Sequence, residues 1–214
     1  MFNDNICRIV VEGPIGVGKT TLARKLAERL DFRADLEQPE NNPFLEKFYR
    51  AMDCHALSTQ LYFLFQRSEQ LEQRNAGLAG QRVVADYMLE KDRLFAELTL
   101  TPEEFELYDK VYRKLDPDLS PPDLVVYLQA PMHDLVDRVR HRRADWDYHL
   151  ESDYLEKVDQ AYATFFHNYR AAPLLIVNTG SVNTVENPQD FDMLLDYMGQ
   201  IETGRHYFNP LGSQ

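Results

Sequence analysis

The sequence predicts an α/β protein whose parallel sheet is covered by helices on both faces. Short apolar stretches alternate with longer segments that carry apolar residues at helical spacing, which is the pattern of repeated strand–helix units. The first apolar stretch leads into GPIGVGKT, residues 13–20, which matches the phosphate-loop pattern of GxxxxGK followed by Ser or Thr. The length of 214 residues and the hydrophobic content of 44% suit one globular domain.

Apolar spacing gives the expected elements in chain order. Short apolar segments predict five strands over 6–11, 34–37, 82–85, 124–128 and 174–177. Helical periodicity predicts helices over 21–30, 44–52, 56–75, 88–98, 102–114, 132–143, 153–170 and 188–201. Thr101, Pro102 and Glu104 form a capping box at the start of one helix. We expect one domain over residues 1–202, and the polar, turn-rich residues 203–214 to form a frayed tail.

The glycine-rich segment lies between the first strand and the first helix. Its backbone N–H groups and the helix dipole would point at anionic oxygen, and Lys19 adds a mobile positive charge. The Thr20 hydroxyl would ligate Mg²⁺. A plain structural turn is the alternative, but motif and context agree on ATP binding. The ATP-binding candidates are Gly13, Pro14, Ile15, Gly16, Val17, Gly18, Lys19, Thr20 and Thr21.

Charge and cysteine content exclude several classes of function. Acidic residues outnumber basic ones by 35 to 23, and the net charge of −12 repels nucleic acids and acidic membrane surfaces. We therefore expect neither a nucleic-acid polymer nor a membrane as partner. Cys7 and Cys54 are too few for a disulfide framework, and Cys7 is expected to be a small buried residue of the first strand. No signal-like N-terminus or membrane-length apolar run is present, which predicts a cytoplasmic protein.

Two carboxylates follow predicted strands at the sheet edge where ligands bind. Glu37 follows the second strand, and Asp86 directly follows the third. Asp86 would face Thr20 and hold Mg²⁺ directly or through water. A surface carboxylate at a strand end is the alternative for each residue. The phosphate loop makes a functional role the better interpretation for both.

The segment 56–75 is apolar almost all round in its middle, which predicts a buried helix. Gln60 and Arg67 are seven residues apart and lie on nearly one face of this helix. A buried amide and a buried guanidinium need partners. They either satisfy internal polar groups, as a structural Arg–carboxylate pair would, or recognise a polar ligand.

A basic cluster follows the fourth strand. Arg138 and Arg142 share a helix face at a spacing of four residues, which is unfavourable unless an anion neutralises them. A lid that closes over a transferring phosphoryl group would use this arrangement. The alternative is a basic surface face that is balanced by neighbouring aspartates.

These residues together resemble the deoxynucleoside kinases, especially the bacterial deoxyadenosine and deoxyguanosine kinase branch. The resemblance covers residues 6–178 and consists of ordered spacings. They are the loop 13–20, Glu37 five residues before Asn42-Pro43, Tyr49 eleven residues before Gln60, Arg67 seven residues later, Asp86 six residues before Asp92-Arg93, and the arginine-rich segment 138–143.

The resemblance implies a P-loop kinase fold with an arginine-rich lid, and a homodimer. It implies transfer of the γ-phosphoryl group of ATP to the 5′-hydroxyl of a deoxynucleoside, with Mg²⁺, for nucleotide salvage. The acceptor would be a purine, deoxyadenosine or deoxyguanosine. The implied roles are Glu37 as general base, Lys19, Arg138 and Arg142 as catalytic cations, Tyr49 and Asp147 at the sugar 3′-hydroxyl, and Gln60, Arg67 and Asp92 around the base.

The chain departs from the family pattern directly after the metal-side carboxylate. Tyr87 and Met88 follow Asp86, where the family usually has Arg and Ser. Arg93 is a candidate to replace the missing arginine at the 5′-hydroxyl.

Two further departures concern the lid and the base. The third lid arginine of the family falls on Ala144, and the adjacent Arg143 is its candidate replacement. Gln38 rather than proline follows Glu37, and Glu40 lies nearby, but Glu37 has the expected distance to Asn42-Pro43.

Two other functions share the phosphate loop. A nucleoside monophosphate kinase would need an arginine pair around the acceptor phosphate, whereas Glu37 would repel that phosphate. A guanine-nucleotide switch would need an Asn-Lys-x-Asp sequence after a late strand, which the segment 178–180, Asn-Thr-Gly, does not supply. A deoxynucleoside kinase is therefore the leading hypothesis.

Overall fold

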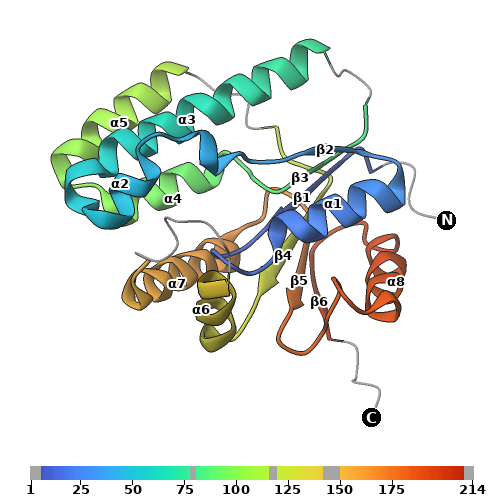
Figure 1. Ribbon diagram of the computed structural model, residues 1–214. Coiled ribbons are helices and arrows are strands. Elements are labelled where there is room, and N and C mark those ends of the chain that lie inside the picture. The colour runs from blue at the N-terminus through green and yellow to red at the C-terminus, as the bar shows by residue number, and fades with distance from the viewer. Residues whose placement is uncertain (1–5, 78–80, 116–119, 142–149, 210–214) are drawn as a thin grey trace.

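The computed structural model describes residues 6–77, 81–115, 120–141 and 150–209. A parallel sheet of six strands, in the order β2-β3-β1-β4-β5-β6, forms the centre of these segments, and helices cover both of its faces (Figure 1). The strands are β1 (Arg8–Glu12), β2 (Arg33–Asp35), β3 (Val83–Ala85), β4 (Leu124–Gln129), β5 (Leu174–Asn178) and β6 (Arg205–Phe208). The predicted fold class is therefore confirmed.

The sixth strand corrects the expected strand count. The sequence predicts five strands and a frayed tail from residue 203, but β6 pairs in parallel with β5, with Leu174 opposite Arg205 and Val177 opposite Phe208. Only Phe208 of this strand is fully buried, whereas Tyr207 is 61% exposed. An edge strand with one buried side chain lacks the apolar run by which the inner strands are recognised.

The helices lie close to their predicted positions. They are α1 (Lys19–Leu30), α2 (Leu45–Arg50), α3 (Met52–Gly77), α4 (Glu90–Thr99), α5 (Pro102–Leu115), α6 (Met132–His141), α7 (Ser152–Asn168) and α8 (Pro188–Met198), with a short 3₁₀ turn, η1, at Pro39–Asn41. The predicted capping box is present, because the Thr101 N–H donates to the Glu104 carboxylate and the Glu104 N–H donates to the Thr101 hydroxyl.

Alternate residues of the inner strands enter two separate cores. Ile9 and Val11 pack with α1 and α8 on one face of the sheet, whereas Val10 packs with α2, α4 and α7 on the other. A third cluster joins α3 to α5 through residues such as Leu64 and Tyr108. The middle of α3 thus contacts neighbours on several sides, which explains why it is apolar almost all round.

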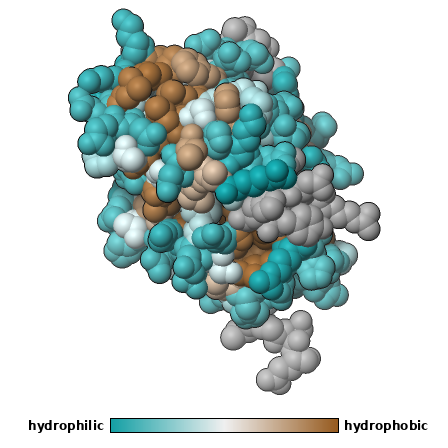
Figure 2. All heavy atoms as spheres, turned by 60° about the vertical axis from the view of Figure 1, so that its left-hand side comes forward, coloured by the Kyte–Doolittle hydropathy of each residue, from teal (hydrophilic) through white to brown (hydrophobic). Residues whose placement is uncertain are grey.

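Cys7 is exposed and precedes β1, so the expectation that it is buried is wrong. Among the residues that the structure describes, no helix combines the length and apolarity needed to span a bilayer. Figure 2 shows that hydrophobic residues gather in a patch on the side of the molecule that carries α2, α3, α4, α5 and α7 in Figure 1.

Candidate functional site

The backbone of the phosphate loop has three positions with positive φ angles, and the sequence places glycine at each of them. Gly13, Gly16 and Gly18 have φ angles of 150°, 83° and 101°, a region that side chains rarely allow. A Cβ atom on Gly13 would lie 2.5 Å from the Leu128 carbonyl oxygen, so the loop packs tightly against β4. Helix α1 begins at Lys19 without a side-chain cap or an acidic residue in its first turn. Its N-terminal N–H groups are thus suited to an anion.

The Lys19 ammonium group lies inside this loop. Its Nζ donates to the carbonyl oxygens of Gly13 at 2.8 Å and Pro14 at 3.1 Å. Burial, followed by the nearby positive charge of Lys91, lowers the pKa of Lys19 to about 8. A bound polyanion would favour the protonated form and reverse this shift.

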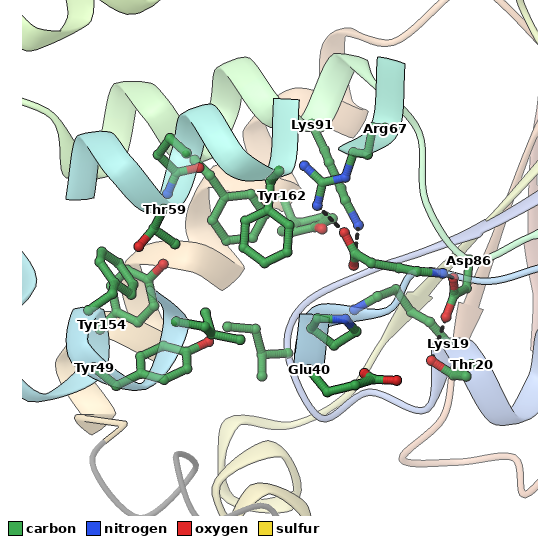
Figure 3. A pocket seen from close by; sticks show the side chains of 18 of the residues that line it. Lys19, Thr20, Glu40, Tyr49, Thr59, Arg67, Asp86, Lys91, Tyr154 and Tyr162 are labelled. Atoms are coloured by element: carbon green, nitrogen blue, oxygen red, sulfur yellow. Dashed lines mark hydrogen bonds and ion pairs between the residues drawn. The ribbon is translucent and has the colours of Figure 1, made fainter. Parts of the chain in front are cut away.

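Two cavities meet at Lys19 and Thr20, which line both of them. The first cavity lies between the phosphate loop, α6 and the segment 179–186. The second lies below α2, α3 and α4, and its lining includes Glu37, Arg67 and a ring of aromatic side chains (Figure 3). The arrangement offers one compartment for the phosphate donor and another for the acceptor, with the loop between them.

Asp86 connects the phosphate loop to Glu37. The Thr20 hydroxyl donates to one carboxylate oxygen of Asp86 at 2.5 Å, and the Glu37 backbone N–H donates to the other at 2.7 Å. Mg²⁺ binds through oxygen atoms, with few protein ligands and with substrate phosphates completing its shell. The Thr20–Asp86 pair fits such an ion. The described residues contain no group of three or more His, Cys, Asp or Glu side chains arranged for a metal.

Two cations, Arg67 and Lys91, contact the Glu37 carboxylate, and a second carboxylate, Asp92, contacts Arg67. Arg67 bridges Glu37 and Asp92, and the side chains of Arg67 and Asp92 are 4% and 1% exposed. The Lys91 Nζ contacts the second Glu37 oxygen at 3.2 Å. Burial opposes the ionisation of Glu37, but Arg67 and Lys91 outweigh it and lower the pKa of Glu37 to about 2. Glu37 is therefore a carboxylate at neutral pH, and Arg67 and Asp92, both expected around the base, pair with each other.

The remaining predicted acceptor-side residues that the structure describes line the same cavity. Gln60 is 3% exposed, and its amide Nε2 donates to the Thr99 hydroxyl at 3.3 Å. The Tyr49 ring lies edge-on to Tyr154, with 6.5 Å between ring centroids. In Figure 3, Tyr49 and Tyr154 lie at the opposite end of the cavity from Lys19. Gln60 and Arg67 are thus both buried and directed into a cavity that could hold a planar polar ligand.

The basic segment is described only in part. Arg138 lies on α6 and donates to the Thr179 hydroxyl at 3.1 Å and to the Val17 carbonyl oxygen at 3.4 Å, which places it beside the phosphate loop. Asp134 on the same helix is 3.8 Å away. Arg142 and Asp147 lie outside the described residues, as do the positions of Arg143 and Ala144.

Arg93 does not reach the acceptor cavity. Its guanidinium pairs with Glu97 at 3.1 Å and Asp109 at 2.9 Å on the outer side of α4, and its side chain is 46% exposed. Arg93 is not among the residues that line the cavity. The expectation that it replaces the arginine missing at Tyr87 is therefore wrong.

Sequence reasoning missed two charged residues of the site. Glu12, the last residue of β1, is fully buried, and Lys91, in the first turn of α4, is 3% exposed. Each had a recognisable signal. Glu12 is a carboxylate at the end of an apolar strand, and Lys91 is a cation at a helix N-terminus, where the dipole favours an anion.

Comparisons with known proteins agree on one family. The family model for deoxynucleoside kinase matches residues 9–201. A deoxyguanosine kinase from Bacillus subtilis is 34% identical over 199 residues, which are 90% of this chain and 96% of that protein. A deoxyadenosine/deoxycytidine kinase from the same organism is 26% identical and covers 90% of this chain and 92% of its own length.

Solved structures show the same fold. The structure of deoxyadenosine kinase from M. mycoides with bound dATP has a TM-score of 0.77 at 22% identity and covers 90% of this chain and all of its own chain. The same protein with bound dCTP has a TM-score of 0.76 at 21% identity and covers 91% of this chain.

Proposed function

The chain belongs to the deoxynucleoside kinase family, and from this premise we propose that it transfers the γ-phosphoryl group of ATP to the 5′-hydroxyl of a purine deoxynucleoside. The product is the deoxynucleoside monophosphate, as nucleotide salvage requires. One observation carries the proposal. A partly buried carboxylate, Glu37, faces the compartment next to Lys19 and Thr20 and is tied by its backbone to Asp86.

The reaction needs one proton acceptor and several cations. The acceptor 5′-oxygen forms a bond to the γ-phosphorus, the bond from phosphorus to the β–γ bridging oxygen breaks, and the hydroxyl proton moves to Glu37. ADP leaves with the bridging oxygen. Lys19 and Arg138 lie on the donor side, where the charge of the transferring group develops. Arg142 is proposed for the same role from its sequence position.

Mg²⁺ is proposed at Thr20 and Asp86. When bound, the ion neutralises charge on the donor phosphates and aligns them. The protein's own contribution is a hydroxyl and a carboxylate oxygen 2.5 Å apart at the start of α1. A single carboxylate and a hydroxyl are a typical protein share of a magnesium–nucleotide site.

The acceptor cavity supports a purine. Arg67 presents guanidinium donors and is held by Asp92, and Gln60 offers an amide on the same helix. An arginine donates well to the N7 and O6 acceptors of guanine, and an amide pairs with adenine. Deoxyguanosine and deoxyadenosine are named as acceptors of relatives, which supports a purine, and one relative is named for deoxycytidine as well. Tyr49, with Asp147, is proposed to hold the sugar 3′-hydroxyl.

A homodimer is also proposed. The groove between α4 and α7 is lined by the apolar residues Leu94, Leu98, Ala161 and Phe165, with charged residues of both signs at its edges. A second copy related by a two-fold axis would place like apolar surfaces together. The apolar residues of α2 and most of those of α3 are used inside the chain instead.

The oligomeric state can be tested at this groove. Ala161→Arg should convert a dimer to a monomer in sedimentation velocity without lowering the melting temperature by more than a few degrees. A monomeric wild-type protein would exclude the dimer.

The cytoplasm, where ATP and Mg²⁺ are abundant, is the proposed location.

A radiolabel transfer assay tests the activity. The protein is incubated with γ-labelled ATP, Mg²⁺ and each of the four deoxynucleosides, with the corresponding monophosphates in parallel. We expect label in deoxyguanosine and deoxyadenosine monophosphate. Labelling of diphosphates alone would show a monophosphate kinase and overturn the proposal. Labelling of thymidine before either purine would overturn the base assignment only.

A further inference from the structure

Lys91 is a buried cation at the centre of the site to which the proposed reaction has so far assigned no role. Its Nζ lies 3.4 Å from a Glu12 oxygen and 3.2 Å from a Glu37 oxygen. Its positive charge also acts on Lys19. Figure 3 shows Lys91 and Arg67 directed into the same end of the cavity, on the side where Lys19, Thr20 and Asp86 lie.

Glu12 fixes the position of this lysine. One Glu12 oxygen accepts from the Met88 N–H at 2.9 Å, and the other accepts from the Tyr162 hydroxyl at 3.1 Å and from the Gly13 N–H at 3.2 Å. A carboxylate with this many donors has one orientation available. Glu12 is also the residue that precedes the phosphate loop, so it connects Lys91 rigidly to the donor compartment.

The side chains of Tyr87, Arg93 and Arg67, which are near Lys91 in the sequence or in the site, are engaged in other contacts. The Tyr87 hydroxyl donates to Asp35 at 2.9 Å, which directs the ring towards β2 and away from the acceptor cavity. Arg93 pairs on the outer surface of α4. Arg67 is shared between Glu37 and Asp92, and its proposed role is at the nucleobase. Lys91 is therefore the cation that contacts both Glu37 and the residue preceding the phosphate loop.

We propose that Lys91 is a positioning residue for phosphoryl transfer, whose Glu12-anchored ammonium group holds the Glu37 carboxylate towards the acceptor hydroxyl and supplies the cation that the sequence lacks at Tyr87. The proposal rests on the proposed function, because it assumes that Glu37 accepts the proton. Lys91 binds one Glu37 oxygen while Arg67 binds the other, so the two cations together fix the orientation of the carboxylate.

The first test compares three single variants under saturating ATP and Mg²⁺. Lys91→Met should lower kcat roughly 10²-fold, because an oriented charged group is lost, while KM for the deoxynucleoside changes less than about threefold. Lys91→Arg should recover most of the loss. Lys110→Met, a change of an exposed lysine on α5, is the matched control and should leave kcat unchanged.

A double variant is the control for misfolding of Lys91→Met. Lys91→Met leaves the Glu12 carboxylate buried without its cation, which destabilises proteins. In Lys91→Met/Glu12→Gln both charges are removed together, the amide oxygen introduced at position 12 can still accept from the Met88 N–H, and its NH₂ group can donate to the Tyr162 hydroxyl oxygen. This double variant should melt at a higher temperature than Lys91→Met and retain the same loss of kcat.

The readouts that separate positioning from packing are the split between kcat and KM and the recovery by Lys91→Arg. A change in packing alone would lower the melting temperature, would change KM together with kcat, and would not be repaired by arginine. Full kcat in Lys91→Met, or a loss that Lys91→Arg does not recover, would overturn the inference. If Glu37→Gln itself kept full activity, the assignment of the base would fail instead.

Discussion

The Glu37 backbone N–H donates a hydrogen bond to the Asp86 carboxylate at 2.7 Å. The other oxygen of the same carboxylate accepts from the Thr20 hydroxyl at 2.5 Å. One side chain thus fixes the distance between the start of α1 and the proposed general base. This coupling matters because a reacting hydroxyl and a phosphoryl group must be held within a few tenths of an ångström of the productive geometry.

Two substitutions at Asp86 separate its two contacts. Asp86→Asn keeps an oxygen for the Glu37 N–H but weakens the metal side, so the Mg²⁺ concentration for half-maximal activity should rise roughly tenfold to a hundredfold. Asp86→Ala removes both contacts and should also lower kcat at saturating Mg²⁺. Activity is measured against Mg²⁺ concentration at saturating ATP. Equal kcat for the two variants at saturating Mg²⁺ would show that the backbone contact is unimportant.

Glu37→Gln tests the proposed proton acceptor. An amide cannot take the hydroxyl proton, so kcat should fall at least about 10²-fold while ATP binding persists. Rapid-quench turnover and equilibrium ATP binding measure the two quantities. Glu40→Gln is the matched control, because Glu40 lines the same cavity but is exposed on η1. A loss of activity in the Glu40 variant and not in the Glu37 variant would reassign the base.

Much of this site could be predicted from the sequence because its signals are local. The phosphate loop, the carboxylates after β2 and β3, and the pair Gln60 and Arg67 on one face of α3 all follow from spacing along one element. Lys91 could not be assigned in this way. Its role depends on Glu12, which lies 79 residues earlier and adjoins it only through the packing of α4 against the sheet. β6 was missed because its single buried residue produces no apolar pattern.

Arg67→Met tests recognition of the base. The change removes guanidinium donors that would face the purine, and hydrogen bonds to charged groups contribute about 1.5–3 kcal/mol. The preference for purines over thymidine, expressed as a ratio of kcat/KM values, should therefore fall roughly tenfold to a hundredfold. Because Asp92 would stay buried without its partner, Arg67→Met/Asp92→Asn is assayed alongside. An unchanged base profile in both variants would return Arg67 to a purely structural role.

Lys19 should make ATP binding depend on pH. In the nucleotide-free protein, burial and the charge of Lys91 lower the pKa of Lys19 to about 8. A bound triphosphate favours the ammonium form, so the pKa of Lys19 rises in the complex and the protein takes up a proton when ATP binds. Affinity should then weaken as pH rises through about 8 and reach a plateau only above the pKa of the complex.

Calorimetry measures this proton uptake directly. Titrations with ATP at pH 8 to 9, in two buffers that differ in ionisation enthalpy, should give different binding enthalpies, and the difference yields the number of protons taken up. Lys91→Met removes a charge that lowers the pKa of Lys19, so its uptake should begin at higher pH. Equal enthalpies in the two buffers throughout this range would show that Lys19 is already fully protonated before ATP binds. Burial in the loop would then not lower the pKa of Lys19.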